Sequence, residues 1–343
     1  MKSPFIRTAV MSVVSSVALL CAVSTAHAGA IFDAVKKKGF VQCGVNTGLP
    51  GFSAADEKGV WTGIDVDVCR AVAAMVFGDA AKVKYTPLTA KERFTALATG
   101  EVDVLSRNAT WTETRDGGLG ISFTGVTYYD GQGFLIKKKL GVKSARKLSG
   151  AAVCVLAGTT TELNLADYFR ANNMKFKAVT YDTADETAKA FDAGRCDVLT
   201  SDQSQLYALR LKLAKPGDAV VLPEIISKEP LGPAVRQGDE DWFKIVRWAL
   251  FAMINAEELG VTSKNVDQMK GSNNPEIKRL LGVEQIQHGL GVKDDWAYQI
   301  VKQVGNYGEA FDRHVGKGSP LKIERGLNAL WTNGGIQYAP PIR

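Results

Sequence analysis

The chain carries two residues of opposite charge at positions where a small zwitterion could bind. Arg115 closes a polar loop that follows a predicted strand at residues 102–105, and Asp202 follows a second predicted strand at residues 196–200. A guanidinium holds a carboxylate through two parallel hydrogen bonds, and a carboxylate holds an ammonium group. Open α/β sheets bind ligands beyond the carboxyl ends of their strands. Arg115 is therefore the candidate that binds the carboxylate of a zwitterion, and Asp202 is the candidate that binds its ammonium group.

Both residues also have a purely structural interpretation. Arg115 could pair on the surface with Glu113 or Asp116, and the spacing favours neither role. Asp202 could cap the helix that follows it, because aspartate is a favoured N-cap residue. The equivalence of Asp202 to Asn108 in an internal repeat favours the ligand-binding role, since both side chains would then face one cleft.

A glycine-containing turn provides a second candidate for the carboxylate. Gly158 precedes Thr159 and Thr160 at a predicted helix N-terminus, where free N–H groups and partial positive charge attract anions. A capping box between Thr159 and Glu162 explains the same residues, and both roles can hold together. With neutral polar partners and one aromatic residue added, the predicted ligand-binding residues are Arg115, Asp202, Thr160, Thr159, Thr110, Asn108 and Phe52.

The repeat joins these residues to the elements that must position them. Gly-x-x-Asp-Val-Leu-Ser at residues 100–106 returns as Gly-x-x-Asp-Val-Leu-Thr at residues 194–200. A Thr-x-x-Glu helix start precedes each copy, at residues 89–92 and 183–186. One helix–turn–strand–loop unit therefore occurs twice, which predicts two similarly built lobes with a cleft between them.

The order of elements predicts the fold class. Strands at 40–45, 82–88 and 102–105 alternate with helices, the first capped by Asp65, which requires a parallel sheet covered by helices. Extended stretches at 120–139 and 220–236 are predicted to cross between the lobes. The predicted fold is α/β, with lobe 1 at 29–130, lobe 2 at 131–228, and the rest of lobe 1 with a helical extension at 229–343.

The N-terminus carries the features of a secretory signal. Lys2 and Arg7 precede an apolar run at 9–23, and Ala-His-Ala at 26–28 is a small-x-small cleavage pattern. We expect export and cleavage near Ala28. The formal net charge of +6 comes from scattered Lys and Arg, which does not favour nucleic-acid binding.

Four cysteines follow the signal, and in an exported protein they predict two disulfides. Three pairings are possible. The repeat favours Cys43–Cys69 in the first lobe and Cys154–Cys196 in the second, because each bond then stays within one unit.

Catalytic patterns are absent from the sequence. Beyond the signal only His288 and His314 remain, so there is neither an HExxH motif nor a Ser/His/Asp set. Gly131-x-Gly133 lacks the rest of a dinucleotide-binding motif. We expect neither a metal nor a cofactor.

The sequence resembles the type II periplasmic solute-binding proteins of polar amino-acid ABC importers, and most closely the general L-amino-acid-binding proteins. The motifs that carry the resemblance are Gly63-Ile64-Asp65-Val66-Asp67, Gly100-Glu101-Val102-Asp103-Val104, Thr112-Glu113-Thr114-Arg115, Gly158-Thr159-Thr160 and Thr200-Ser201-Asp202.

The resemblance implies two lobes that are joined by two crossing strands and close over a free L-amino acid. Arg115 and the Thr159–Thr160 amides would then hold the α-carboxylate, Asp202 the α-ammonium group, and Asn108 and Thr110 would add polar contacts. It also implies a tail packed on lobe 1, delivery of the amino acid to a membrane permease, and a periplasmic location. We expect a monomer and no enzymatic activity.

Departures from the family pattern bear on specificity. Binders of cationic amino acids often have Asp and an aromatic residue where this chain has Asn46 and Leu49, so we expect a broad preference. The alternative is a secreted dehydratase of the prephenate type on the same fold, for which Glu162 is the candidate general acid.

Overall fold

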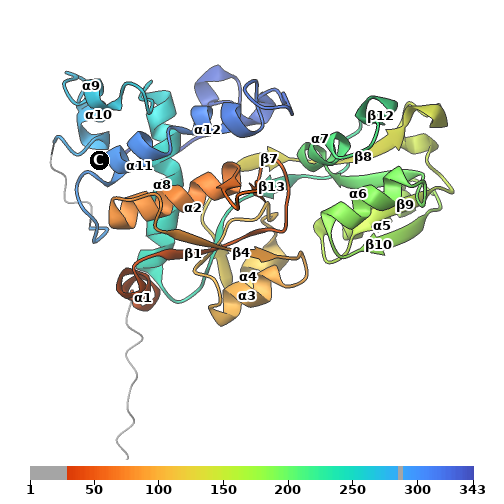
Figure 1. The fold of residues 1–343 in the computed structure, drawn as a ribbon, viewed down its shortest axis with the longest axis horizontal. Helices are drawn as coiled ribbons and strands as arrows, with labels where there is room; N and C mark the ends of the chain where they lie inside the picture. The colour runs from red at the N-terminus through yellow and green to blue at the C-terminus, as the bar shows by residue number, and fades with distance from the viewer. Residues whose placement is uncertain (1–28, 285–288) are drawn as a thin grey trace, which may run out of the picture.

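The structure, a computed structural model, describes residues 29–284 and 289–343, which form two α/β lobes lying side by side (Figure 1). The predicted signal peptide at residues 1–28 lies outside the described residues. Among the helices that are described, none combines the length and the apolar character needed to cross a membrane.

Lobe 1 is built on a five-stranded sheet with the order β4-β1-β5-β14-β6. β1, β4 and β5 are parallel, whereas β14 is antiparallel to β5 and β6. The five strands are β1 (Val41–Asn46), β4 (Val83–Leu88), β5 (Val104–Leu105), β6 (Ile121–Phe123) and β14 (Ala234–Arg236).

Lobe 2 repeats this arrangement in the order β10-β9-β11-β8-β12. β9, β10 and β11 are parallel, and β8 is antiparallel to β11 and β12. The strands are β8 (Gln132–Lys137), β9 (Ala152–Leu156), β10 (Lys177–Tyr181), β11 (Val198–Asp202) and β12 (Ala219–Val221). β5 and β11, which carry the repeated motif, occupy the same central place in the two sheets. The predicted α/β fold with two similar lobes is therefore confirmed.

Helices cover the sheets of both lobes (Figure 1). Those of the first part of lobe 1 are α1 (Ala30–Lys38), α2 (Ile64–Phe77), α3 (Arg93–Thr99) and α4 (Glu113–Gly118). Those of lobe 2 are α5 (Thr160–Ala171), α6 (Ala184–Asp192) and α7 (Gln203–Leu211). The C-terminal part adds α8 (Glu240–Glu258), α9 (Val266–Met269), α10 (Pro275–Leu280), α11 (Trp296–Gln303) and α12 (Tyr307–His314).

The predicted capping signals stand at the starts of the two equivalent helices. Thr183 and Glu186 form a complete capping box at α6. Thr89 and Glu92 exchange the same reciprocal hydrogen bonds, although α3 itself begins at Arg93.

The prediction that Asp65 caps α2 is wrong. Gly63 is the N-cap residue, with φ of 135°, and a Cβ atom at Gly63 would lie 2.0 Å from the carbonyl oxygen of Phe52. Only glycine fits this close approach of two backbones. Asp65 therefore lies inside the first turn of α2, where its side chain is buried in lobe 1.

Two crossing strands join the lobes, as predicted. β7 (Tyr128–Asp130) leads from lobe 1 into lobe 2, and β13 (Glu229–Leu231) leads back. They pair with each other as a two-stranded antiparallel sheet, separate from the two lobe sheets. Where each lobe begins and ends along the chain, near residues 130 and 228, stays a prediction.

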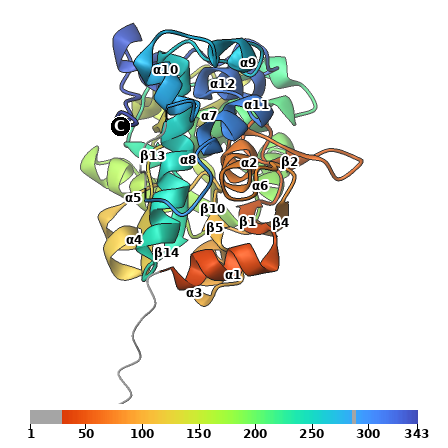
Figure 2. The ribbon, with the colours of Figure 1, turned by 90° about the vertical axis from the view of Figure 1, so that its left-hand side faces the viewer.

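The C-terminal residues pack on lobe 1. α11 contacts α2 and α8, and α12 contacts α8 and α2. Asp67 on α2 accepts a hydrogen bond from Arg313 and lies 2.7 Å from His314 Nε2, which ties α12 to lobe 1. On another side of lobe 1, the hairpin of β2 (Ala54–Ala55) and β3 (Trp61–Thr62) projects outward (Figure 2).

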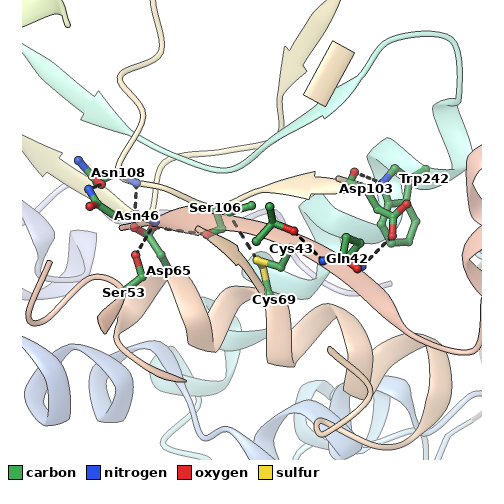
Figure 3. Close-up of a disulfide and its surroundings, with 12 residues drawn as sticks. Gln42, Cys43, Asn46, Ser53, Asp65, Cys69, Asp103, Ser106, Asn108 and Trp242 are labelled. Carbon is green, nitrogen blue, oxygen red and sulfur yellow. Dashed lines mark hydrogen bonds between the residues drawn. A yellow bond between two sulfur atoms is a disulfide. The ribbon is translucent and has the colours of Figure 1, made fainter. Parts of the chain in front are cut away.

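Both predicted disulfides are confirmed. Cys43–Cys69 joins β1 to α2 in lobe 1, and Cys154–Cys196 joins β9 to the residues before β11 in lobe 2. Figure 3 shows the first bond beside the buried polar residues Asn46, Ser53, Asp65 and Asn108 at the end of β1. The first bond thus fixes α2 to β1, and the second fixes the residues before β11 to β9.

Candidate ligand-binding site

A small polar cleft lies where the two lobes meet. Its walls come from the loop after β5, the turn before α5 and the junction of β11 with α7. Residues of both lobes line it: Arg93, Arg107, Asn108, Thr110, Leu156, Thr159, Thr160, Thr161, Ser201, Asp202 and Gln205. The cleft thus brings together most of the predicted site residues, but neither Arg115 nor Phe52 lines it.

Asp202 is the last residue of β11, and one oxygen of its buried carboxylate has no hydrogen-bond partner among the described residues. It occupies the N-cap position of α7, yet its side chain caps no backbone N–H, so the capping interpretation does not hold. Oδ2 accepts a hydrogen bond from Gln205 Nε2, whereas the buried Oδ1 has no partner among the described residues. Burial, and after it the charges of Asp130 and Glu229, raises the pKa of Asp202 well above its usual range.

The turn before α5 offers free backbone donors in the same cleft as this carboxylate. Thr159 accepts a hydrogen bond from the N–H of Glu162 at 3.2 Å, and Glu162 accepts one from the N–H of Gly158. The N–H groups of Thr160 and Thr161 have no partner within the described part of the chain. Unpaired N–H groups at a helix N-terminus attract an anion.

Hydrogen bonds with Asp65 and Asn46 fix the position of Asn108. Its φ is 38°, a left-handed conformation that asparagine tolerates. Its N–H donates to Asp65 Oδ2 at 2.7 Å, and its side-chain oxygen accepts from Asn46 Nδ2 at 2.9 Å. Figure 3 shows Asp65 between this loop and the disulfide. Burial raises the pKa of Asp65 to about 7, against the lowering effects of the Asn108 N–H, the charge of Arg107 and the Ser106 hydroxyl.

Thr110 and Thr160 join the lobes through a third residue. Their hydroxyl oxygens are 3.3 Å apart, and both hydroxyls donate to Glu229 Oε2, at 2.6 and 2.9 Å. Glu229 begins the crossing strand β13 and is buried. Its other oxygen accepts hydrogen bonds from Asn164 and Ser227. Sequence analysis missed Glu229, because nothing in its neighbourhood marks it as facing the other lobe.

Arg115 lies behind the cleft wall. One of its Nη atoms donates to the carbonyl oxygen of Thr110 at 2.8 Å, and its guanidinium lies over the Phe94 ring. Within the described residues it makes no ion pair with Glu113 or Asp116, so the alternative of a surface pair does not hold.

Phe52 does not cover the cleft. Its ring is 1% exposed and packs edge-to-face against Tyr128 with 5.5 Å between ring centroids. The close approach of Gly63 to the Phe52 backbone turns this residue into the core of lobe 1. The structure thus places Phe52 in the core of lobe 1, and its contact with a ligand side chain stays a prediction.

Two arginines of the cleft were also missed. Arg107 lies between Ser106 and Asn108 in the loop after β5, and its Nε donates to the carbonyl of Leu88. Arg93 is the first residue of α3, and its buried Nε has no partner among the described residues. The position of Arg107 directly after a strand end was a usable signal; Arg93 looked like an ordinary helix residue.

The described residues do not support a metal site or the dehydratase alternative. The described residues contain no group of His, Cys, Asp or Glu that could hold a metal ion. His314, at the end of α12, pairs with Asp67 of α2 and does not line the cleft. His288 lies outside the described residues. Glu162, the candidate general acid of a dehydratase, is engaged with the Gly158 N–H and does not line the cleft.

Two α/β lobes, a pair of crossing strands and a polar cleft between the lobes define a two-lobed solute-binding protein of the type II periplasmic class. The chain belongs to the bacterial extracellular solute-binding proteins, family 3, which it matches over residues 41–265. The prediction that it is a solute-binding protein rather than an enzyme is confirmed. Residues 266–343 extend beyond the family match.

Relatives with known names match almost the whole chain. The putative amino-acid ABC transporter-binding protein YhdW of Escherichia coli O157:H7 is 66% identical over 95% of this chain and 96% of that protein. The general L-amino acid-binding periplasmic protein AapJ of Rhizobium johnstonii is 61% identical over 98% of this chain and 100% of that protein. A solved ABC transporter periplasmic binding protein from Brucella ovis, with glutathione bound, is 60% identical with a TM-score of 0.89, covering 91% and 98% of the two chains.

Proposed function

We propose that this chain is the periplasmic substrate-binding component of an amino-acid ABC importer. It is exported, loses its signal near Ala28, binds a free L-amino acid between its lobes as a monomer, and delivers it to a permease in the inner membrane. The names of the close relatives support this class of function. The observation that carries the proposal is the unpartnered buried oxygen of Asp202 in the same cleft as the unpaired Thr160 and Thr161 N–H groups.

Each end of the ligand has a partner in this scheme. Asp202 Oδ1 accepts from the α-ammonium group, because a buried carboxylate with a free oxygen gains most from a charged donor. The α-carboxylate lies against the α5 N-terminus. Arg115 reaches it from behind Thr110 with the guanidinium donors not used on the Thr110 carbonyl.

Closure of the lobes completes the site. The open form binds the amino acid on one lobe, and movement about β7 and β13 brings in the groups of the other lobe. Thr110 and Thr160, from opposite lobes, then meet on Glu229 in the hinge strand. Because Glu229 bonds both lobes only when they are close, it favours the closed form that a permease recognises.

The test is thermal unfolding of the ligand-stripped mature chain in the presence of each L-amino acid. A ligand at about 100 times its dissociation constant adds about 2.7 kcal/mol to the stability of the folded state, which is an easily measured shift. Asp202→Asn, which keeps the size of the side chain, should abolish the shift. Asp167→Asn, an exposed change on α5, is the matched control and should keep it. Absence of a shift with every amino acid would overturn the proposal.

A further inference from the structure

A second pocket, of about 440 Å³, lies in lobe 2 and shares no residue with the ligand cleft. Its walls come from the end of β8, the residues after α7 and the start of β12, the edge strand at the right of Figure 1. Its charged lining residues are Lys137, Lys138, Lys139, Lys215, Asp192 and Asp218. We call this hollow the lysine pocket.

The two acids of the lysine pocket do not balance its four lysines. Asp192 is engaged within the protein, because Lys137 Nζ lies 3.9 Å from its Oδ1 and its Oδ2 accepts a hydrogen bond from the Ala214 N–H at 3.0 Å. Lys137 Nζ also donates to the Asp192 carbonyl oxygen at 2.6 Å.

The other three lysines, Lys138, Lys139 and Lys215, are exposed and make no ion pair within the described residues. Three ammonium groups therefore face the single remaining carboxylate, that of Asp218. A negatively charged partner would find unmatched cations here.

The excess of positive charge extends over the whole of lobe 2. Residues 131–228 contain 15 Lys and Arg against 10 Asp and Glu. Residues 29–130 and 229–343 together contain 25 Lys and Arg against 26 Asp and Glu. Beyond the predicted signal, the positive excess of the chain thus belongs to lobe 2 alone. A field of one sign on one lobe turns that lobe toward a negatively charged surface.

Apolar side chains accompany the lysines. Leu213 and Ala219 line the pocket itself. Leu140 follows Lys139 in the short helix η1 (Lys138–Leu140) and is 41% exposed. A free anion gains nothing from an exposed leucine. A lipid surface takes lysine ammonium groups at its phosphates and apolar side chains at the boundary with the acyl chains, so it fits both features.

We propose that lobe 2 docks on an anionic phospholipid surface, with the lysine pocket binding a phosphodiester headgroup and Leu140 entering the boundary with the acyl chains. The docking residues belong neither to the ligand cleft nor to the crossing strands β7 and β13, so docking leaves both free. Docking goes beyond the proposed function, and it holds for any solute that the cleft binds.

Co-sedimentation of the mature chain with lipid vesicles tests the inference. The protein should bind vesicles of equal parts phosphatidylglycerol and phosphatidylcholine, and it should not bind vesicles of phosphatidylcholine alone. Binding should decline as the salt concentration rises, because salt screens the charges. Absence of binding to the anionic vesicles at low salt would overturn the inference and leave an acidic protein as the partner of lobe 2. Equal binding to both kinds of vesicle would overturn the role of the lysines.

Variants assign the binding to the lysine pocket. Lys138→Gln combined with Lys139→Gln should weaken binding to the anionic vesicles at least about tenfold, since each basic residue near such a surface contributes roughly fivefold. Lys37→Gln combined with Lys58→Gln is the matched control, because it removes the same charge from exposed positions of lobe 1. The control should bind nearly as the wild type does. Equal weakening in the two double variants would show that net charge alone acts, and would overturn the assignment.

Two further arms separate a lipid surface from a free anion. Leu140→Ser should weaken vesicle binding a few-fold at every salt concentration, because salt does not screen apolar contacts. Unchanged binding in Leu140→Ser would overturn the insertion of this side chain. Calorimetric titration with inorganic phosphate should give no measurable binding. Phosphate binding that the double variant of Lys138 and Lys139 loses, without any binding to vesicles, would overturn docking on a lipid surface.

Discussion

Asp65 is a single buried residue that shapes the cleft without lining it. Its two oxygens accept the N–H of Asn108 at 2.7 Å and the hydroxyl of Ser106 at 3.4 Å, and so fix the loop after β5. These hydrogen bonds hold Asn108 in its left-handed conformation, with φ of 38°, which asparagine tolerates better than most residues. The carboxylate thus holds a cleft residue at the cost of its own hydration.

The burial of Asp65 predicts how stability depends on pH. Its folded-state pKa of about 7 lies above the unfolded value of 3.8, so the folded protein holds the proton more tightly. The stabilising contribution is complete below about pH 4 and is lost as pH rises through about 7. Asp65→Asn should flatten this fall, which is at most about 4 kcal/mol from the pKa difference.

Urea unfolding of the ligand-free protein at pH 4 to 8 measures this effect. Asp130 and Asp202, whose pKa values burial also raises, contribute with the same sign, so some dependence remains in the variant. Asp56→Asn, in the exposed β2–β3 turn, serves as the control. Parallel curves for Asp65→Asn and the wild type would contradict the assignment.

The hinge strand β7 shows how one element depends on a distant part of the chain. Asn328 Oδ1 accepts a hydrogen bond from the Tyr129 N–H at 2.7 Å, and Asn328 Nδ2 donates one to the Tyr129 carbonyl at 3.1 Å. Tyr307 and Gln337 bond the carbonyls of Thr127 and Val126, just before β7. The C-terminal tail therefore supplies hydrogen-bond partners for the backbone of the first crossing strand and of the residues just before it.

Asn328→Ala should destabilise the protein by about 1–3 kcal/mol, because it leaves two backbone groups of Tyr129 without their partner. Asn333→Ala, an exposed change a few residues on, is the control and should have little effect. Chemical denaturation of the ligand-free chain gives the difference. Equal stability of the two variants would mean that water replaces Asn328 without cost.

At the scale of the whole molecule, the lobes approach each other at the rim of the cleft as well as within it. Lys91 of lobe 1 lies 2.6 Å from Asp182 of lobe 2, and Lys212 of lobe 2 donates to the carbonyl of Gly48 in lobe 1. Both rim contacts are solvent-exposed, unlike the buried contacts on Glu229. Solvent and salt screen exposed pairs, so the rim should adjust closure rather than drive it.

A charge exchange tests this contact between the lobes. Lys91→Asp should weaken ligand binding by only a few-fold, since it opposes closure by repelling Asp182, and the effect should fade at high salt. Combining it with Asp182→Lys should restore the affinity. Lys84→Asp, an exposed change on the same lobe, is the control. An unchanged affinity in Lys91→Asp would show that the rim does not take part in closure.

Local sequence signals determined the architecture and part of the site. The repeated Gly-x-x-Asp-Val-Leu unit predicted two equivalent strands, and the same repeat predicted Cys43–Cys69 and Cys154–Cys196. Such signals succeed because strand ends, helix starts and short disulfide loops depend on neighbouring residues. For the same reason Asn108, Thr110, Thr159, Thr160 and Asp202 could be placed at the cleft, since each stands within a few residues of a strand end.

Tertiary packing decided the remaining features. Glu229 reaches Thr110 and Thr160 from residues more than sixty positions away, and no local pattern encodes that meeting. Arg93 faces the cleft because α3 packs against the sheet in one orientation, while the backbone approach at Gly63 turns Phe52 into the core. The sequence by itself determined which strand ends carry polar residues. Only the folded chain decided which side chains face the cleft, because their direction depends on how distant segments pack.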